Sequence, residues 1–272
     1  MKNLFITGAS SYLGKNLIEA LNDYKIFALE NSKKIELSNN INVISQLPKD
    51  LNEFFNKNKI EYIVHLATNS NRDNERLELE NIVSTNIELG LKIQRASISS
   101  SVKKIISAGT YNQDVIVNPQ SAYALSKECY EKFQKFFSTQ FYINNTSIHF
   151  GDIYGPNDFR NKLIPYIKKH ENDKCIEFNS DGNSYFSPVY IGDAVGAITD
   201  EFKSTSKHSF LSKIVASDLI TVKEFTDLYK QIRHKNFECK FLGNVKQDYI
   251  STKDFYPSKN LKFDLVYGLS SI

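Results

Sequence analysis

Residues 7–14 read Thr-Gly-Ala-Ser-Ser-Tyr-Leu-Gly, and this stretch decides the fold. A short apolar run, residues 2–7, leads into it, and apolar side chains at helical spacing follow it. The pattern predicts a strand, a tight turn and a helix. Gly8 permits the turn and Gly14 lets the helix pack closely on the sheet, while Ser11 stands where a third glycine is usual.

A turn of this kind is a candidate phosphate site. Backbone N–H groups at the start of a helix bind a pyrophosphate, and the Ser11 hydroxyl adds a further donor. A glycine pair alone also occurs in ordinary turns, but its place between a strand and an amphipathic helix favours a dinucleotide cofactor. The residues expected to bind that cofactor here are Gly8, Ser10, Ser11, Tyr12, Leu13 and Gly14.

Glu30 bears on the choice between NAD and NADP. It ends the next apolar run, residues 25–29, where a carboxylate can accept hydrogen bonds from the adenosine ribose hydroxyls. A carboxylate there repels the 2′-phosphate of NADP, so NAD(H) is favoured. Lys33 and Lys34 follow closely and can neutralise a phosphate, so NADP(H) stays possible, and a solvated glutamate at a strand end is the alternative role.

The N-terminal half repeats the strand-and-helix alternation. Residues 82–96 carry apolar side chains at a helical period, between two of the apolar runs. Alternating strands and helices predict an α/β fold with a doubly wound, mostly parallel sheet. The apolar runs after the first two are residues 60–67, 104–107 and 145–150.

A further helix is expected after Pro119, and a change of organisation after Gly155. The residues expected to share the buried face of that helix are Ala124, Cys129, Phe133, Phe136 and Phe137. Beyond Gly155 the alternation weakens, although residues 221–232 predict an amphipathic helix. We therefore expect a dinucleotide-binding domain over residues 1–150, with 186–200 returning to it, and a smaller substrate-binding lobe over 151–272.

Composition excludes several classes of protein. The 272 residues carry a net charge of only +3, spread along the chain, which argues against a nucleic-acid partner. Three widely spaced cysteines form no CxxC pair, so free thiols in a reducing cytosol are expected rather than disulfides or a metal site. No apolar run approaches membrane-spanning length, so we expect a cytoplasmic protein without a membrane partner.

Tyr123 and Lys127 form the candidate catalytic pair. Their spacing of four places both on one face of a helix. A free phenol has a pKa of about 10, and a nearby positive charge lowers it toward neutrality. The YxxxK pattern alone is common on surface helices, but a nucleotide-binding turn upstream makes it more specific.

In the order of its motifs the chain resembles the extended short-chain dehydrogenase/reductases, the NAD-dependent epimerase/dehydratase family, over residues 1 to about 200. Within it the chain is most similar to bacterial nucleotide-sugar 4-ketoreductases such as CDP-paratose and CDP-abequose synthases. The matching stretches are the TGxxxxxG turn, His65-Leu66-Ala67-Thr68, Asn86, Ser107-Ala108-Gly109-Thr110, Tyr123 with Lys127, and Asp152-Ile153-Tyr154-Gly155-Pro156.

The resemblance implies a Rossmann-type fold and a role for each matched residue. Tyr123 transfers a proton, Lys127 binds the nicotinamide ribose, and Thr110, or in reserve Ser107, polarises the substrate oxygen. Hydride passes between the nicotinamide and a sugar carbon. Further cofactor-binding residues are then Leu66, Ala67, Thr68 and Asn86, and the substrate-binding residues are Thr110, His149, Asp152 and Arg160.

Three departures from the family's pattern refine that expectation. Tyr111 and Asn112 replace the Asp-Glu pair that dehydratases place after the catalytic Thr, so elimination of water is not expected. The family's arginine before the Tyr-Gly-Pro strand is His149, and its Arg-Asp pair reads Phe186-Ser187. Those arginines help to bind the nucleotide diphosphate, a role that His149 or Arg160 would have to take over.

The leading interpretation is a 4-keto-sugar reductase of surface-polysaccharide biosynthesis. A C4 epimerase, which oxidises and re-reduces one carbon, is the close rival, and a non-catalytic dinucleotide-binding regulator is the alternative from another class. Intact Tyr123 and Lys127 argue against the regulator. The resemblance also implies a homodimer that pairs through the helices expected at residues 82–96 and 122–137.

Overall fold

The computed structural model describes residues 1–30, 40–70, 76–118, 121–204, 209–243, 249–250, 257–258 and 260–272. Lys33 and Lys34, named above for NADP, lie outside them. The chain forms two compact units. The first comprises residues 1–113, 121–149 and 195–213, and the second comprises residues 114–120, 150–194 and 214–272. The segment 195–213 of the first unit overlaps in part with the predicted returning segment, residues 186–200.

A sheet of seven strands in the order β12-β7-β5-β4-β1-β2-β3 organises the first unit. The pairs β1–β2, β1–β4, β2–β3 and β4–β5 are parallel. The strands are β1 (Lys2–Thr7), β2 (Tyr24–Leu29), β3 (Ile41–Ile44), β4 (Tyr62–His65), β5 (Lys104–Thr110), β7 (Asn145–Phe150) and β12 (Phe210–Val215). The doubly wound α/β class is confirmed.

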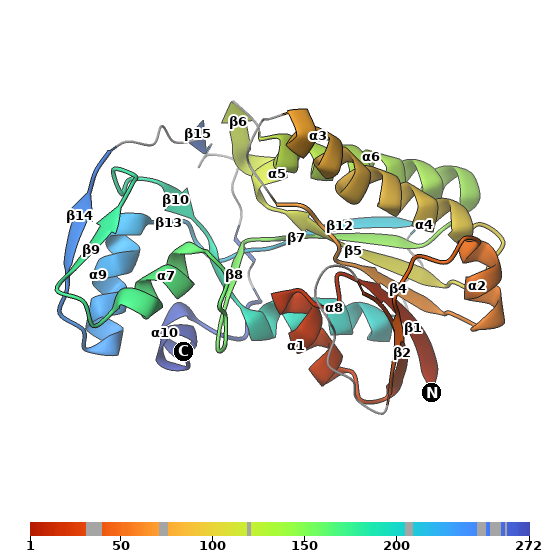
Figure 1. The fold of residues 1–272 in the computed structure, drawn as a ribbon, viewed down its shortest axis with the longest axis horizontal. Helices are drawn as coiled ribbons and strands as arrows, with labels where there is room; N and C mark the ends of the chain where they lie inside the picture. The colour runs from red at the N-terminus through yellow and green to blue at the C-terminus, as the bar shows by residue number, and fades with distance from the viewer. Residues whose placement is uncertain are drawn as a thin grey trace. The chain divides into compact units, whose positions relative to one another are not determined.

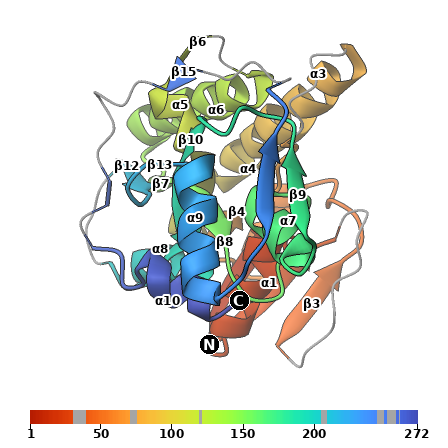
Figure 2. The same cartoon turned by 90° about the vertical axis from the view of Figure 1, so that its left-hand side faces the viewer.

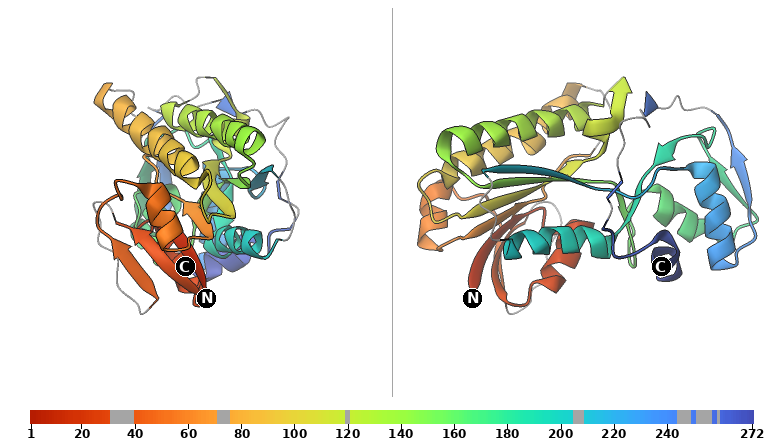
Figure 3. Two further views of the ribbon diagram at one scale, coloured as in Figure 1. Left: turned by 90° about the vertical axis from the view of Figure 1, so that its right-hand side faces the viewer. Right: turned by 180° about the vertical axis from the view of Figure 1, so that it is seen from behind.

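Helices cover both faces of this sheet (Figures 1 and 3). On one face lie α2 (Leu51–Lys57), α3 (Arg76–Val83), α4 (Leu89–Ser97) and α6 (Ala122–Phe141), and on the other lie α1 (Tyr12–Ala20) and α8 (Ile191–Lys203). A π-helical turn, η1 (Ser84–Glu88), joins α3 to α4, so the predicted helix over 82–96 is one helical run of three segments.

The core under α2 and α4 follows from the alternation along the strands. Phe5, Ile63 and Ile105 point to the same face of the sheet and are completely buried against Phe55 and Ile93 from the two helices. Burying a side chain of this size stabilises the fold by about 1.5–3 kcal/mol. This packing fixes the carboxyl ends of the central strands at one edge of the sheet.

The buried face predicted for α6 is wrong at Phe133 and Phe136, which are 42% and 51% exposed, whereas Ala124 is buried as predicted and Phe137 packs partly buried against the core. The helix instead buries a mostly polar stripe against the sheet, made of Ala124, Ser126, Lys127, Tyr130, Gln134 and Ser138. The prediction failed because it placed the aromatic side chains inward, whereas the sheet edge beneath this helix presents polar groups.

Small strand pairs and three helices form the second unit (Figure 2). β8 (Asp152–Tyr154) pairs in parallel with β11 (Pro188–Tyr190), and β9 (Cys175–Phe178) with β14 (Glu238–Phe241). The antiparallel pairs are β10 (Tyr185–Phe186) with β13 (Ile220–Thr221), and β6 (Ile116–Asn118) with β15 (Tyr249–Ile250). The helices are α7 (Leu163–His170), α9 (Val222–Arg233) and α10 (Leu265–Ser270); the short α5 (Asn112–Val115) lies where the chain passes from one unit to the other.

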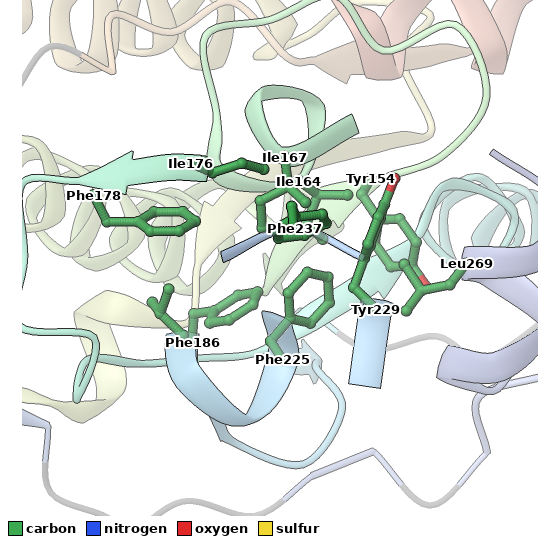
Figure 4. Packing of buried hydrophobic residues seen from close by; sticks show 11 residues of the cluster. Tyr154, Ile164, Ile167, Ile176, Phe178, Phe186, Phe225, Tyr229, Phe237 and Leu269 are labelled. Carbon is green, nitrogen blue, oxygen red and sulfur yellow. The ribbon is translucent and has the colours of Figure 1, made fainter. Parts of the chain in front are cut away.

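An aromatic core holds the second unit together. Phe186, Phe225 and Tyr229 converge there with Ile164 and Ile167 of α7 (Figure 4). The predicted helix over 221–232 is confirmed as α9, and Thr221 caps it with Glu224 in a reciprocal capping box. Within the described part of the chain, no helix is long and apolar enough to cross a membrane.

Candidate active site

The turn between β1 and α1 has the geometry expected for a nucleotide-binding turn. The N–H of Ser11 donates to the carbonyl of Gly8 over 3.0 Å, which closes the turn. The Ser11 hydroxyl accepts the N–H of Gly14 at 3.0 Å and so caps the helix. Ser11 stands where a third glycine is usual. Its side chain fixes the first turn of α1, which a glycine could not do.

Two glycines of the turn are required by close backbone contacts. Gly8 has a φ of +72°, and a Cβ there would lie 2.6 Å from the backbone of Leu66 and Ala67. A Cβ on Gly14 would lie 2.4 Å from the carbonyl oxygen of Gly8. The turn thus packs directly on the segment that follows β4. The predicted cofactor-binding residues of the turn therefore lie beside Leu66 and Ala67, which were predicted for the same role.

Thr7 and His65 join the ends of β1 and β4. The Thr7 hydroxyl lies 2.7 Å from Nδ1 of His65 and accepts the N–H of Ala67 at 3.2 Å. Burial, and secondarily the charge of Lys127, lowers the pKa of His65 to about 3, so the ring is neutral at physiological pH. His65 is a packed residue, 3% exposed, and it holds the strand end in place.

Asn86 lies in the π-helical turn and is 1% exposed. Its Oδ1 accepts the N–H of Asn69 at 2.7 Å and the hydroxyl of Thr68 at 3.1 Å. Its Nδ2 donates to Ser126 of α6 and to the Asn69 carbonyl, both at 2.9 Å. Asn86 therefore fastens the segment after β4 to the helix that carries Tyr123, and π-helical turns often mark functional sites.

Tyr123 and Lys127 lie on the first two turns of α6. Ser121 caps this helix by accepting the N–H of Ala124 at 3.2 Å, which sets where its first turn begins. The Lys127 ammonium donates to the carbonyl of Ala108 in β5 at 2.8 Å, and Nζ lies 6.0 Å from the ring centroid of Tyr123. The spacing of four therefore brings the phenol and the ammonium to the carboxyl end of β5.

Lys127 is buried, with 5% of its surface exposed. Desolvation lowers its pKa to about 8. Within the described residues its ammonium forms no ion pair with a carboxylate, and its hydrogen bond goes to a backbone carbonyl. A buried ammonium without a counter-charge is suited to holding polar hydroxyls or lowering the pKa of a neighbouring phenol.

Ser107 and Thr110, the two candidate hydroxyls, differ in their surroundings. Ser107 is 2% exposed and accepts a hydrogen bond from Nε2 of Gln134 at 2.7 Å, underneath α6. Thr110 ends β5, and its hydroxyl oxygen accepts the N–H of Asn112 at 3.3 Å. Both hydroxyl oxygens accept in these bonds, so each can still donate its own proton, and the difference lies in their place: Ser107 lies under α6, whereas Thr110 is the last residue of β5.

His149 points into the first unit rather than out of it. The ring is 1% exposed, and its Nε2 lies 3.2 Å from Glu131 of α6, 3.1 Å from Ser147 and 3.4 Å from Ser212. A side chain buried in this way does not present itself to a nucleotide diphosphate. This burial argues against the expectation that His149 takes over the role of the family's arginine.

Glu30 directly follows β2. The register places Thr7 beside Leu29, so Gly8 and Glu30 follow neighbouring strands at the same edge of the sheet. The Glu30 N–H donates to the carbonyl of Ile44 at 2.8 Å, which holds the residue there. This place suits a carboxylate that contacts the ribose of a dinucleotide whose phosphates lie at the turn.

The remaining substrate-binding candidates, Asp152 and Arg160, belong to the second unit. Asp152 begins β8, and its N–H donates to the carbonyl of Ser187 at 2.6 Å. Arg160 forms a bidentate contact with Asp158, with both distances 2.8 Å. Its guanidinium thus already serves a carboxylate of its own loop.

Asp193, near the start of α8, contacts a later stretch of the chain. It lies inside the first turn of α8 and accepts the backbone N–H of Lys262 at 2.7 Å and of Phe263 at 3.3 Å. Burial raises the pKa of this carboxyl group, against the effect of those two bonds. Asp193 therefore fastens the C-terminal segment of the second unit.

Sequence reasoning missed Gln113 and Glu131. Nε2 of Gln113 donates to the Glu131 carboxylate at 2.5 Å, and its Oε1 accepts the N–H of Thr110 at 3.2 Å. Glu131 follows Lys127 by four residues on the same helical face, which was a usable signal, whereas nothing in the pattern indicates Gln113. Among the described residues, no group of three or more His, Cys, Asp and Glu could hold a metal ion.

Named relatives and solved structures are similar to the chain. CDP-abequose synthase of Salmonella typhimurium is 24% identical over 217 residues, 71% of this chain and 68% of that protein. The dTDP-4-dehydro-6-deoxyglucose reductase of Escherichia coli is 24% identical over 252 residues, 82% and 79% of the two chains. A Tyr-to-Phe variant of UDP-glucuronic acid 4-epimerase from Bacillus cereus superposes with a TM-score of 0.84 over 99% and 97% of the chains at 17% identity, so the likeness lies in the fold.

The model of the NAD dependent epimerase/dehydratase family matches residues 4–203. The matched range holds the turn after β1, Glu30 after β2, and the Tyr123 and Lys127 pair beside β5. A helix start that packs through two required glycines, with a carboxylate on the neighbouring strand, fits the dinucleotide that this family uses. The chain therefore belongs to the NAD-dependent epimerase/dehydratase family.

Proposed function

We propose that the chain reduces a 4-keto sugar carried on a nucleotide, with NADH favoured over NADPH as the reductant, in the synthesis of a surface-polysaccharide sugar. The observation that carries the proposal is the position of Lys127, which is buried, lacks a carboxylate partner among the described residues, and bonds to β5 beside Tyr123. The names of two relatives, a CDP-abequose synthase and a 4-keto-sugar reductase, support the substrate class.

The residues around the turn would hold the cofactor. The N-terminus of α1 and the hydroxyls of Ser10 and Ser11 suit the pyrophosphate, and Glu30 suits the adenosine ribose. Lys127 suits the nicotinamide ribose, with the segment Leu66–Thr68 and Asn86 supporting that end of the site. When bound, the reduced cofactor supplies the hydride.

Tyr123 and Thr110 would handle the sugar oxygen. Reduction of a ketone places negative charge on that oxygen, and the Tyr123 phenol donates the proton that neutralises it. The Lys127 ammonium favours the phenolate that remains, because opposite charges stabilise each other in a buried site. The Thr110 hydroxyl donates a hydrogen bond to the same oxygen and orients the carbonyl.

A C4 epimerase is the second candidate, because the family is defined by epimerases as well as dehydratases and the same pair would serve it. An epimerase returns its cofactor to the starting state in each cycle and should retain NAD tightly. A reductase consumes one NADH for each alcohol formed.

The first test is to denature the purified protein, identify any released nucleotide by mass, and follow NADH consumption with dTDP-, CDP- and UDP-4-keto sugars. An empty protein that consumes NADH with one of them supports the reductase. Co-purified NAD with interconversion of C4 epimers and no NADH consumption supports the epimerase. Dinucleotide binding without turnover of any sugar in a broad panel would point to the regulator instead.

We further propose that the chain forms a homodimer through the helical run α3-η1-α4, which contains the predicted helix over 82–96, and through α6. These helices pack against each other on one face of the sheet (Figure 3) and expose apolar side chains that a monomer normally buries. The exposed residues are Leu79 and Val83 of α3 and Leu125, Phe133 and Phe136 of α6.

The homodimer is tested by light scattering coupled to size exclusion. Replacing Phe133 and Phe136 with Asp should convert a dimer into a monomer, because a second copy would bury the charges. Phe159→Asp is the matched control, since that side chain is 90% exposed and belongs to the second unit. A wild-type monomer at micromolar concentration would contradict the dimer.

A further inference from the structure

A partly buried hydrogen-bonded network links the end of β5 to α6 and is separate from the Tyr123 and Lys127 pair. Its members are Gln113, Glu131 and His149, all within the first unit. Glu131 Oε2 receives Nε2 of Gln113 at 2.5 Å and lies 3.2 Å from Nε2 of His149. None of these residues is used by the mechanism proposed above.

The protonation state of Glu131 fixes the orientation of the Gln113 amide. Burial raises the pKa of Glu131, but hydrogen bonds from His149, Ser212 and Gln113 outweigh burial and lower it overall. A carboxylate only accepts hydrogen bonds, so the Gln113 NH₂ group must face it. The Gln113 oxygen is thereby turned toward the backbone N–H of Thr110, which it accepts at 3.2 Å.

Gly109 leaves the space in which this network forms. A Cβ at this position would lie 2.5 Å from the His149 ring and 3.0 Å from Oε1 of Gln113. The network therefore packs directly against the backbone of the residue before Thr110. A larger side chain would displace the two groups that hold Glu131 and the Thr110 amide.

We propose that Gln113 and Glu131 are positioning residues that hold Thr110 in register for its contact with the substrate oxygen, with His149 fixing the Glu131 carboxylate. The inference rests on the proposed function, because it gives Thr110 a substrate to contact. Neither residue touches the reacting atoms. They act by fixing the backbone at the end of β5, where a displacement of about 1 Å is enough to slow catalysis about 10²-fold.

The test first replaces Gln113 and Glu131 singly, which mismatches the amide and the carboxylate. It then combines both changes, which restores an amide facing a carboxylate. Gln113→Glu places two carboxylates against each other, and Glu131→Gln removes the charge that orients the amide. Each single change should lower kcat about 10- to 100-fold, with KM for NADH and for the sugar changed less than about threefold. In the double variant the carboxylate at position 113 accepts the Thr110 N–H and faces an amide at 131, so kcat should recover to within about threefold of wild type.

Glu128→Gln is the matched control, because Glu128 lies on the same helix and pairs with the exposed Lys132 at 2.6 Å. It should leave kcat unchanged. Unchanged kcat in both single variants, or a double variant no better than the worse single one, would overturn the proposal. If kcat and the melting temperature fall together in both single variants and in the double variant, the network has a purely structural role. That result would also overturn the proposal.

A second measurement does not depend on activity. Hydrogen exchange of the Thr110 amide, followed by NMR, should be at least about tenfold faster in Gln113→Ala and in Glu131→Gln than in wild type. Equal protection in all three proteins would contradict the link even if the enzyme proved inactive on every sugar tested. A wild type that protects the amide but reduces no sugar would overturn the proposed function while leaving the network's hold on Thr110 supported.

Discussion

Two buried lysines lie near opposite ends of β5 and differ in their partners. Lys104, the first residue of the strand, forms an ion pair with Glu201 at 3.0 Å, with side-chain exposures of 7% and 8%. Lys127 meets the strand near its other end and bonds to the Ala108 carbonyl. A carboxylate neutralises the first ammonium, whereas the second has no carboxylate partner among the described residues. The difference is the one expected between a lysine that stabilises the fold and one that serves the proposed reaction.

The first ion pair belongs to a wider cluster. Glu201 also binds Lys213 at 2.8 Å and accepts the hydroxyl of Thr146 at 3.1 Å. Burial raises the pKa of Glu201, but the bonds with Lys213 and Lys104 outweigh burial and lower it overall. Lys104 and Lys213 thus share Glu201 as their counter-charge, so no ligand is needed to explain this cluster.

The largest effect is expected at the reactive end of the strand. Tyr123→Phe removes the proton donor but keeps the ring, so kcat should fall about 10²- to 10⁴-fold. The dissociation constant for NAD should stay within a few-fold of wild type. Both are measured by steady-state kinetics and by calorimetric titration, and a variant with normal turnover would remove Tyr123 from the mechanism.

The two lysines should respond in opposite ways to the same change. Lys104→Met leaves a buried carboxylate with one fewer partner and should lower the free energy of unfolding by about 1–3 kcal/mol, because Lys213 still pairs with Glu201. Among the described residues Lys127→Met leaves no carboxylate unpaired, so it should cost little stability but weaken NAD binding at least about tenfold. Urea unfolding and cofactor titration of both variants measure the difference. Loss of stability in both would show that Lys127, too, is structural.

The lowered pKa of Lys127 predicts a pH dependence of stability. At pH values between the folded-state pKa of about 8 and the ordinary pKa of 10.5, Lys127 carries a proton in the unfolded chain that it has released in the folded chain. Stability from this group therefore rises with pH across that window and is lost as pH falls back through it. The free energy of unfolding of wild type minus that of Lys127→Met should rise by up to roughly 3 kcal/mol. If this difference in the free energy of unfolding does not change with pH, the Lys127 ammonium lies in a solvated site.

A smaller effect is expected at Glu30. Replacing it with Ala removes an acceptor for the ribose hydroxyls and a charge that repels a 2′-phosphate, so NAD should bind about tenfold more weakly. NADP should bind equally well or better. Titration of both dinucleotides measures the ratio, and equal weakening would exclude a ribose contact.

Most of the central sheet was predictable from the sequence. The apolar runs at 2–7 and 145–150 match β1 and β7 residue for residue, because these strands are buried along most of their length. The edge strand β3 and the helix α2 were not predicted. β3 is short and only partly buried, whereas α2 carried a usable signal, since Asp50 caps it and Leu51 and Phe55 share its buried face.

The site was predictable where chemistry and spacing coincide. Tyr123 and Lys127 lie together because four residues make about one helical turn. The face of α6 was mispredicted because this helix buries Ser126 and Gln134 while Phe133 and Phe136 stay exposed, which reverses the usual pattern. Gln113 lies outside any periodic pattern, since its role depends on a contact with a helix that begins several residues later.

The most direct test of the account is to incubate the enzyme with dideuterated NADH, labelled at both C4 positions, and a 4-keto nucleotide sugar, and to locate the label in the product by NMR. The account predicts deuterium on carbon 4 of the sugar, with one NAD⁺ formed for each alcohol. An epimerised or unchanged sugar without deuterium, across dTDP-, CDP- and UDP-linked substrates, would contradict it.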